Sequence, residues 1–222
     1  DSAVLVAHEA RSAGVQPVYI RAGLAWEAEE RTLLERLLQS PALRGGVAPL
    51  ASLTVEVADL YPAGHWAIRG APPAYDTPDE DVYLPGRNVL LLSTAAVYCA
   101  ARGIPRLAIG PLAGNPFPDA TPEFFAAMAR ALSLGLAHDL RIDAPFAAMH
   151  KADVIRLGQA LGVPLGLTLS CMNPRGGLHC GVCNKCRERR DAFVEADVPD
   201  PTGYLAPSPR DTAARRPSTA GR

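Results

Sequence analysis

Four of the five cysteines lie between positions 171 and 186, in the order Cys171-x8-Cys180-x2-Cys183-x2-Cys186. A Cys-x-x-Cys turn directs two thiolates at one centre, about 2.3 Å from each sulfur when the metal is zinc. Gly181 eases the tight turn, and the first ligand comes from across a glycine-containing loop. Four sulfur ligands fill a tetrahedral shell and leave no open position for water. The spacing therefore predicts a structural zinc site.

Two other interpretations of the cluster remain open at this point. Four thiolates can also hold an iron–sulfur cluster, and cysteines can lie as free thiols in a core. His179 could compete as a ligand, but four sulfurs suffice, so we expect it outside the ligand shell or at the surface. Cys99 stands in an apolar stretch and is expected to be a small core residue. Nearby cations could offset the thiolate charge: Lys185, Arg187, Arg189 and Arg190.

Composition restricts the class of protein. The 222 residues carry a net charge of −1, which gives no overall attraction to nucleic acid or anionic membranes. Apolar residues make up 48% and charged residues 20%, an ordinary globular balance. The sequence has no apolar run of about 18 residues and no pattern of a secretory signal at its start. We therefore expect a cytoplasmic protein, where clustered cysteines bind metal rather than form disulfides.

Helical and strand patterns alternate along the chain and must position these groups. Apolar spacing predicts helices over 3–13, 26–38, 88–102, 122–134 and 151–161. Short apolar runs predict strands over 15–20, 53–57, 106–110 and 140–145. This alternation predicts an α/β fold with a doubly wound, mostly parallel sheet. The Pro- and Gly-containing stretch 61–86 is long for a connection and suggests a functional loop.

Two of these helices carry further signals. The helix over 122–134 has Thr121 as N-cap, Pro122 in its first turn and Gly135 as a stop signal. The stretch 88–102 is apolar nearly all round, which predicts a buried helix. The open parallel sheet would bind its ligand at the carboxyl ends of the strands, where a helix N-terminus can face a phosphate.

The chain resembles the 7-cyano-7-deazaguanine synthase family of the PP-loop ATP pyrophosphatase superfamily over nearly all of residues 1–204. The segments that carry the resemblance are PGRN (85–88), IGPLAGNPFPDATPEF (109–124), APFAAMHKADVIRLGQALGVPLGLTLSC (144–171) and HCGVCNKCRERRDAF (179–193). The most specific parts are PGRN, HKADVIRLG and the cysteine spacing, which matches the family's four zinc ligands. The resemblance implies an adenine-nucleotide α-hydrolase-like fold with a C-terminal zinc-binding helical and loop element.

The resemblance also implies a division of the chain. We expect a nucleotide-binding α/β domain over 1–168, a zinc-binding element over 169–205 and a disordered tail over 206–222. The family's ATP loop reads SGG-x-DS, and Asp1-Ser2 look like its last two residues. The preceding Ser, the two Gly and the first strand are then expected to be missing from the N-terminus of this sequence. A chain without them is expected to bind ATP poorly.

The activity that the resemblance implies is ATP-dependent conversion of 7-carboxy-7-deazaguanine and ammonia to the nitrile, in the queuosine pathway. Its cofactors would be ATP, Mg²⁺ and a structural Zn²⁺. Its partners would be small molecules, the deazapurine carboxylate and ammonia, with no membrane or nucleic acid, and a homodimer would fit the family.

Site residues follow from the matching positions. Ser2, the amide of Ala3 and Gly86 would contact phosphate, and Asp1 would help to organise Mg²⁺. The predicted catalytic cations are Arg87, facing the phosphates or the substrate carboxylate, and Lys151, at a helix start where a cation opposes the dipole. Either cation could instead be a solvated surface residue.

Two segments depart from the family's usual text, RAGLAWEAEE (21–30) and AGNPFPDAT (113–121). In the second, we predict that Asn115 and Asp119 contact substrate, with Asp119 accepting from a guanine-like N–H edge. NPFPD is also good turn chemistry. In the long loop, His65-Trp66 could stack on a base or form an exposed packing pair.

Other functions fit part of the pattern. An adenylating amide ligase or amidotransferase would keep the ATP site and use a different acceptor. A non-enzymatic zinc-containing regulatory or nucleic-acid-binding protein would draw support from the Arg-containing tail, against the near-neutral charge.

Overall fold

A computed structural model describes residues 1–57 and 59–210 of the chain. The helices and strands alternate as expected. The helices are α1 (Ser2–Glu9), α2 (Glu27–Leu38), α3 (Trp66–Arg69), α4 (Arg87–Ala100), α5 (Pro122–Leu136), α6 (Lys151–Ala160) and α7 (Asn184–Ala196). The strands are β1 (Val18–Arg21), β2 (Ala51–Thr54), β3 (Arg106–Ala108) and β4 (Arg141–Asp143). Within the described part, no helix is both long and apolar enough to cross a membrane.

All four strands pair in parallel, which confirms the α/β class with a parallel arrangement. β1 pairs with β2 in the register Val18↔Ala51, and β3 pairs with β4 in the register Arg106↔Arg141. Among the described residues these pairs form two separate two-stranded sheets. Helix α4 packs against both β1 and β3 and so links the two sheets.

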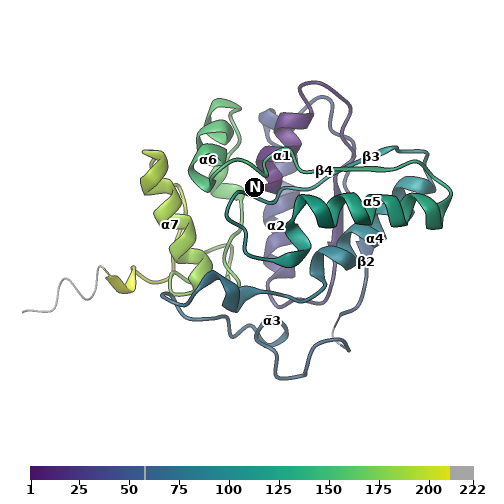
Figure 1. Cartoon of the computed structure of the whole chain (residues 1–222). Coiled ribbons are helices and arrows are strands. Elements are labelled where there is room, and N and C mark those ends of the chain that lie inside the picture. The colour runs from purple at the N-terminus through teal and green to yellow at the C-terminus, as the bar shows by residue number, and fades with distance from the viewer. Residues whose placement is uncertain (58, 211–222) are drawn as a thin grey trace, which may run out of the picture.

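The helices form two groups around the strands. Figure 1 shows α6 and α7 side by side at one end of the molecule, while α4 and α5 pack together near β3 and β4. α1 contacts α6 closely, because a Cβ atom on Gly158 would lie 2.8 Å from Val4 Cγ2. The core between α1, α2 and α6 contains Val4, Leu5, Leu37, Phe146 and Val154.

Several predicted boundaries and one predicted environment are wrong. α1 ends at Glu9 rather than near residue 13, and β2 begins at Ala51, two residues before the predicted strand. α4 buries only Leu92, Ala96 and Cys99, whereas Val97 is 56% exposed. This helix packs on the outside of the strands, so one stripe suffices for the core despite its apolar composition.

Helix α5 confirms its predicted start and corrects its predicted end. Thr121 Oγ1 accepts from Phe124 N at 3.1 Å, so Thr121 is the N-cap. Gly135 lies inside the helix, which ends at Leu136. The left-handed residue is Ala137 at φ 47°, whose N–H donates to the carbonyls of Leu134 and Ser133. These backbone bonds stop the helix without a glycine.

The long stretch 61–86 is structured, with α3 and a 3₁₀ turn over Asp79–Val82. It packs on the cysteine cluster, since Ala74 bridges to Cys183. The predicted disordered tail is also corrected at its start: Ala206 O accepts from Arg190, and Ser208 is buried, with its Oγ donating to Tyr75 Oη at 3.1 Å. The rest of that predicted tail, 211–222, lies outside the described residues.

Candidate metal centre and phosphate site

The four clustered cysteines come together in one buried group. All four side chains are less than one tenth exposed, and their Sγ atoms lie within 4.8 Å of one another. Cys186 Sγ lies 3.8 Å from Cys180 Sγ and 3.5 Å from Cys183 Sγ. A tetrahedron with zinc–sulfur bonds of about 2.3 Å has edges of about 3.8 Å. None of the four is in a disulfide. The cluster is therefore consistent with zinc binding.

Backbone amides and a close turn fix the sulfur positions. Cys180 N donates to Cys171 Sγ at 3.1 Å, and Gly181 N donates to Cys186 Sγ at 3.3 Å. Such donors stabilise thiolate charge. Gly181 has φ +84°, and a Cβ atom there would lie 2.2 Å from the carbonyl oxygen of Ala206. Glycine is required at 181 for both reasons.

His179 is 2% exposed and lies beside the cluster, outside the group of sulfurs. Its Nε2 accepts from Ser170 N at 3.1 Å. Burial, with the charge of Arg189, lowers the pKa of His179 to about 4. The neutral imidazole accepts a hydrogen bond from the backbone and so supports the loop that carries Cys171. This is the kind of role expected for a residue outside the ligand shell.

The basic residues near the cluster direct their hydrogen bonds elsewhere. Arg189 donates to Leu165 O and two threonine hydroxyls, and Arg190 donates to Gly181 O and Ala206 O. Arg187 pairs with Asp79. In the described chain no lysine or arginine donates a hydrogen bond to a cluster sulfur. These side chains attach residues 169–205, which carry the four cysteines and are called the metal element below, to the rest of the protein.

A cavity of about 1160 Å³ runs past the first turn of α1 and is lined by residues of both β1 and β3. The predicted ligand-facing groups on this cavity are Asp1, Ser2, Ala3, Arg87, Asn115, Asp119 and Lys151. These residues thus line one large cavity, and their contact with a ligand stays a prediction. Gly86 supports them from outside it, as the left-handed N-cap of α4 at φ 76°.

Lys151 lies on the wall of this cavity and bonds to the N-cap residue of α1. Its Nζ donates to Asp1 Oδ2 at 3.1 Å and to Glu188 Oε1 at 2.7 Å. Lys185 donates to the other oxygen of Glu188. Burial alone would raise the pKa of Glu188, but the two lysines lower it to about 2. Glu188 is therefore an anion between two cations.

The first turn of α1 adds amide donors to this region. Asp1 is its N-cap but makes no side-chain cap hydrogen bond, so the early N–H groups are available to a ligand. Free amides in the first turn of a helix suit an anion such as phosphate.

Arg87 lies on the same cavity as a second cation. Its side chain is exposed and forms no hydrogen bond or ion pair with other described residues. Glu30 of α2 faces the same space and accepts from Tyr19 Oη at 2.9 Å. Burial raises the pKa of Glu30, while the Tyr19 hydrogen bond and the charge of Arg87 oppose the rise. Sequence reasoning missed Glu30, because its neighbours on α2 are ordinary surface charges.

The two predicted substrate residues already have local partners. Asn115 Oδ1 accepts from Phe117 N at 3.0 Å, a turn-forming bond. Asp119 is 7% exposed, and its Oδ2 accepts from Asn88 N at 3.0 Å at the start of α4. The geometry favours turn and cap roles for both, and contact with substrate stays a prediction.

The aromatic pair in the long stretch is half-buried and packs against other rings. Trp66 stacks on Trp26 with ring centroids 5.8 Å apart, and His65 stacks on Tyr61 at 4.8 Å. The Trp26 partner comes from the segment that departs from the family's usual text. These rings form a packing group, which favours the structural interpretation of His65-Trp66.

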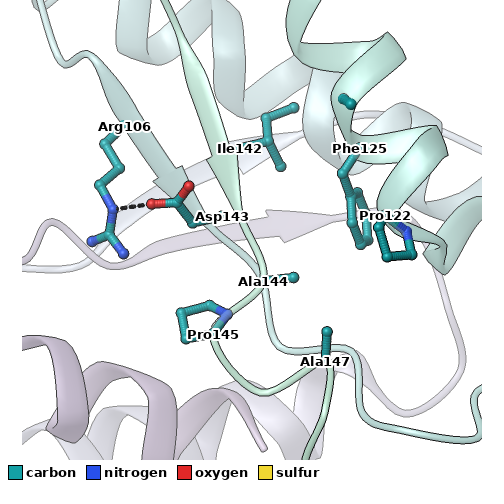
Figure 2. A pocket seen from close by; sticks show the side chains of 9 residues that line it. Arg106, Pro122, Phe125, Ile142, Asp143, Ala144, Pro145 and Ala147 are labelled. Atoms are coloured by element: carbon teal, nitrogen blue, oxygen red, sulfur yellow. Dashed lines mark hydrogen bonds and ion pairs between the residues drawn. The ribbon is translucent and has the colours of Figure 1, made fainter.

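A second, smaller cavity of about 490 Å³ lies beside β4 and the start of α5 (Figure 2). Its charged lining residues, Arg106 and Asp143, point toward each other, and Arg106 also pairs with Glu9 of α1. Phe125 and Pro122 form the opposite wall. Arg106 is paired with both carboxylates, so among the lining residues of this cavity no charged side chain is left unpaired to act in catalysis.

Comparisons with known proteins agree with this geometry. The profile of a family described as queuosine biosynthesis protein QueC matches residues 72–197, which include PGRN, Lys151 and all four clustered cysteines. A protein named 7-cyano-7-deazaguanine synthase from Methanothrix thermoacetophila is 34% identical over 205 residues, 88% of this chain and 90% of that protein.

Two proteins of the same name match a shorter part. The one from Anaeromyxobacter dehalogenans is 40% identical over 129 residues, and the one from Methanoculleus marisnigri is 43% identical over 126 residues. Each alignment covers 55% of this chain and only 55% or 56% of the relative, about half of its length. The profile and the long match together show that this chain belongs to the QueC family.

Proposed function

We propose that this protein is an ATP-dependent carbon–nitrogen ligase that converts 7-carboxy-7-deazaguanine and ammonia to 7-cyano-7-deazaguanine. The observation that carries the proposal is the group at one end of the cavity in which Lys151 Nζ lies 3.1 Å from Asp1 Oδ2, at the open first turn of α1. The names of the family relatives support the choice of reaction.

The reaction requires activation because a carboxylate is a poor electrophile. Transfer of AMP from ATP to the carboxylate oxygen releases pyrophosphate. Ammonia then attacks the acyl carbon and displaces AMP, which gives the amide. A second ATP adenylates the amide oxygen, with release of pyrophosphate and of one N–H proton, and loss of AMP and the second N–H proton leaves the nitrile. Neither adenylation needs a covalent link to the protein, so the protein contributes positioning and positive charge.

This chain offers groups for those tasks. The α1 amides, Ser2 and Lys151 would bind phosphate oxygens, and Arg87 would reach the phosphates or the substrate carboxylate. Asp1, already bonded to Lys151, would share its other oxygen with Mg²⁺ or with water on it. Asn115 and Asp119 would line the acceptor end.

We also propose zinc as the metal of the four-cysteine site. Zinc would be held by all four sulfurs and would stabilise the fold of the element without taking part in the chemistry. The cytoplasm, where thiolates stay reduced and ATP is abundant, is the compartment that this proposal implies. A homodimer is part of the proposal on family grounds.

The test is a turnover assay of the full-length protein with ATP, Mg²⁺, ammonia and 7-carboxy-7-deazaguanine, with AMP and nitrile followed by mass spectrometry. Formation of both products would support the proposal. AMP release without nitrile would favour an adenylating ligase with another acceptor, a candidate that draws support from the local bonds of Asn115 and Asp119. If neither AMP nor nitrile formed while metal stayed bound, the proposed function and the alternative ligase would both be refuted.

A further inference from the structure

The use of lysine in this chain is unusual. The 22 basic residues comprise two lysines and twenty arginines. Both lysines, Lys151 of α6 and Lys185 of α7, donate to the same carboxylate, that of Glu188. Arginine serves every other charged contact of the described residues, including the buried and bidentate ones. The two lysines therefore share one location and one partner.

The shared carboxylate leaves donors unused. An ammonium has three N–H donors. Lys151 uses two of them, on Asp1 and Glu188, and Lys185 uses one, on Glu188. Within the part of the chain that the structure describes, three donors remain unused on the two lysines, whose charges are balanced by Asp1 and Glu188; the side chains of Lys151, Lys185 and Glu188 are about a quarter exposed (24–25%).

These donors face the same cavity as the open turn of α1. Asp1, Lys151, Lys185 and Glu188 all line the cavity of about 1160 Å³. A compact ammonium with rotatable donors suits a phosphate chain whose oxygens shift during a reaction, whereas a guanidinium fixes one planar arrangement. Lys185 shares with Lys151 its partner Glu188, a place on the cavity wall and unused donors.

We propose that Lys185 is a second phosphate-binding lysine, and that Glu188 is a positioning residue that holds Lys151 and Lys185 beside the first turn of α1. This inference rests on the proposed use of ATP and extends it to a residue of the metal element. Lys185 stands between Cys183 and Cys186, so the metal cluster sets its position. The four-cysteine site thereby contributes a group to the nucleotide site, in addition to stabilising the fold.

The test uses the small number of amines. The full-length protein is labelled briefly with acetic anhydride, with and without Mg²⁺-ATP, and acetylation of each lysine is measured by peptide mass spectrometry. Calorimetry on the same sample measures ATP binding. We expect saturating ATP to slow labelling at Lys151 and Lys185 by about tenfold each, and AMP to protect them less because it lacks the outer phosphates.

The outcomes separate this inference from the proposed function. ATP binding that protects Lys151 but leaves Lys185 labelled at its free rate would overturn the inference and keep the function. Absence of ATP binding in the full-length protein would overturn both.

Variants supply a second measure. Lys185→Gln removes charge-assisted bonds and should weaken ATP binding about tenfold or more, with metal content unchanged. Glu188→Gln should weaken ATP binding without removing metal and should alter the labelling rates of both lysines. Asp191→Asn is the matched control, because Asp191 lies on α7, is 55% exposed and is outside the cavity lining. Unchanged ATP affinity in Lys185→Gln with metal retained would refute the phosphate role.

Discussion

Replacement of Arg189 by methionine should be among the most destabilising changes in the metal element. Arg189 is 5% exposed and donates to Thr202 Oγ1 at 2.6 Å, Thr168 Oγ1 at 2.9 Å and Leu165 O at 2.8 Å. Its Nε also lies 3.7 Å from Asp200 Oδ1. One guanidinium thus joins α7 to two separate loops.

The magnitude follows from what the change leaves behind. Methionine can fill most of the volume, so the cavity cost is small. It leaves Asp200 without its cation and leaves Leu165 O without its donor. Removal of one partner from a buried ion pair costs about 3–5 kcal/mol. Asp200 keeps its bonds from Thr202 and Tyr204, which places the expected loss near about 3 kcal/mol. In a chain of this size that lowers Tm by about 6–12 °C.

Thermal and urea unfolding of the metal-loaded protein would measure the loss, with Arg189→Lys as the control. Lysine keeps a positive charge near Asp200 but cannot span three acceptors, so we expect about half the loss. Metal content, measured on each variant, should stay at the wild-type level, because no guanidinium contacts a sulfur. A Tm change below about 3 °C in the methionine variant would refute this account of the loops.

Three further changes test other contacts. Glu9→Gln should flatten the fall of stability that occurs as the pH drops below about 4.5. The hydrogen bond from Arg106 lowers the pKa of Glu9, so the stabilisation by this carboxylate is present above the pKa of the unfolded state and is lost as the pH falls through the folded-state pKa. Urea unfolding at several pH values would measure the difference. Cys183→Ser should lower the bound metal, measured by mass spectrometry of the ions, and should lower Tm by about 6–12 °C if the site contributes about 3 kcal/mol. Unchanged metal content would contradict a four-sulfur site. Asp119→Ala should lower the free energy of unfolding by about 1 kcal/mol, measured with denaturant, because it removes the acceptor for Asn88 N. Asp119→Asn keeps an acceptor oxygen and should keep the stability. Loss of substrate binding in the asparagine variant at full stability would instead support the substrate role.

Local patterns in the sequence predicted the features that depend on local geometry. The cysteine spacing predicted one four-sulfur group, because the Cys-x-x-Cys turns fix where those thiolates point. Thr121 and Pro122 predicted the start of α5, because a cap bond forms within one turn. The strand and helix alternation predicted a parallel α/β arrangement, because short parallel strands need helical crossovers.

Other features depend on partners that no local pattern shows. The apolar sequence of α4 predicted burial all round, but the position of the helix outside the strands leaves Val97 exposed. Lys185 was expected to offset thiolate charge, yet its ammonium donates to Glu188 on the wall of the cavity of about 1160 Å³. Asp119 matched a family position, and its bond to Asn88, far back in the sequence, could be seen only in the fold.

The metal element shows why such contacts escape sequence reasoning. It is held by polar side chains that meet backbone groups from distant segments: Glu29 of α2 accepts from the amides of Gly176 and Gly177, and Asn184, fully buried, donates to Thr77 O at 2.6 Å. The composition of residues 206–210 predicted little burial. The carbonyl of Ala206 nevertheless packs against Gly181, and this backbone contact needs no apolar side chain. Each of these contacts joins a common polar side chain or a backbone group to a distant backbone atom, so the hydrophobic periodicity of the sequence does not predict it. The four-cysteine element is therefore positioned by contacts with distant segments of the fold, and the phosphate role that we propose for Lys185 depends on that positioning.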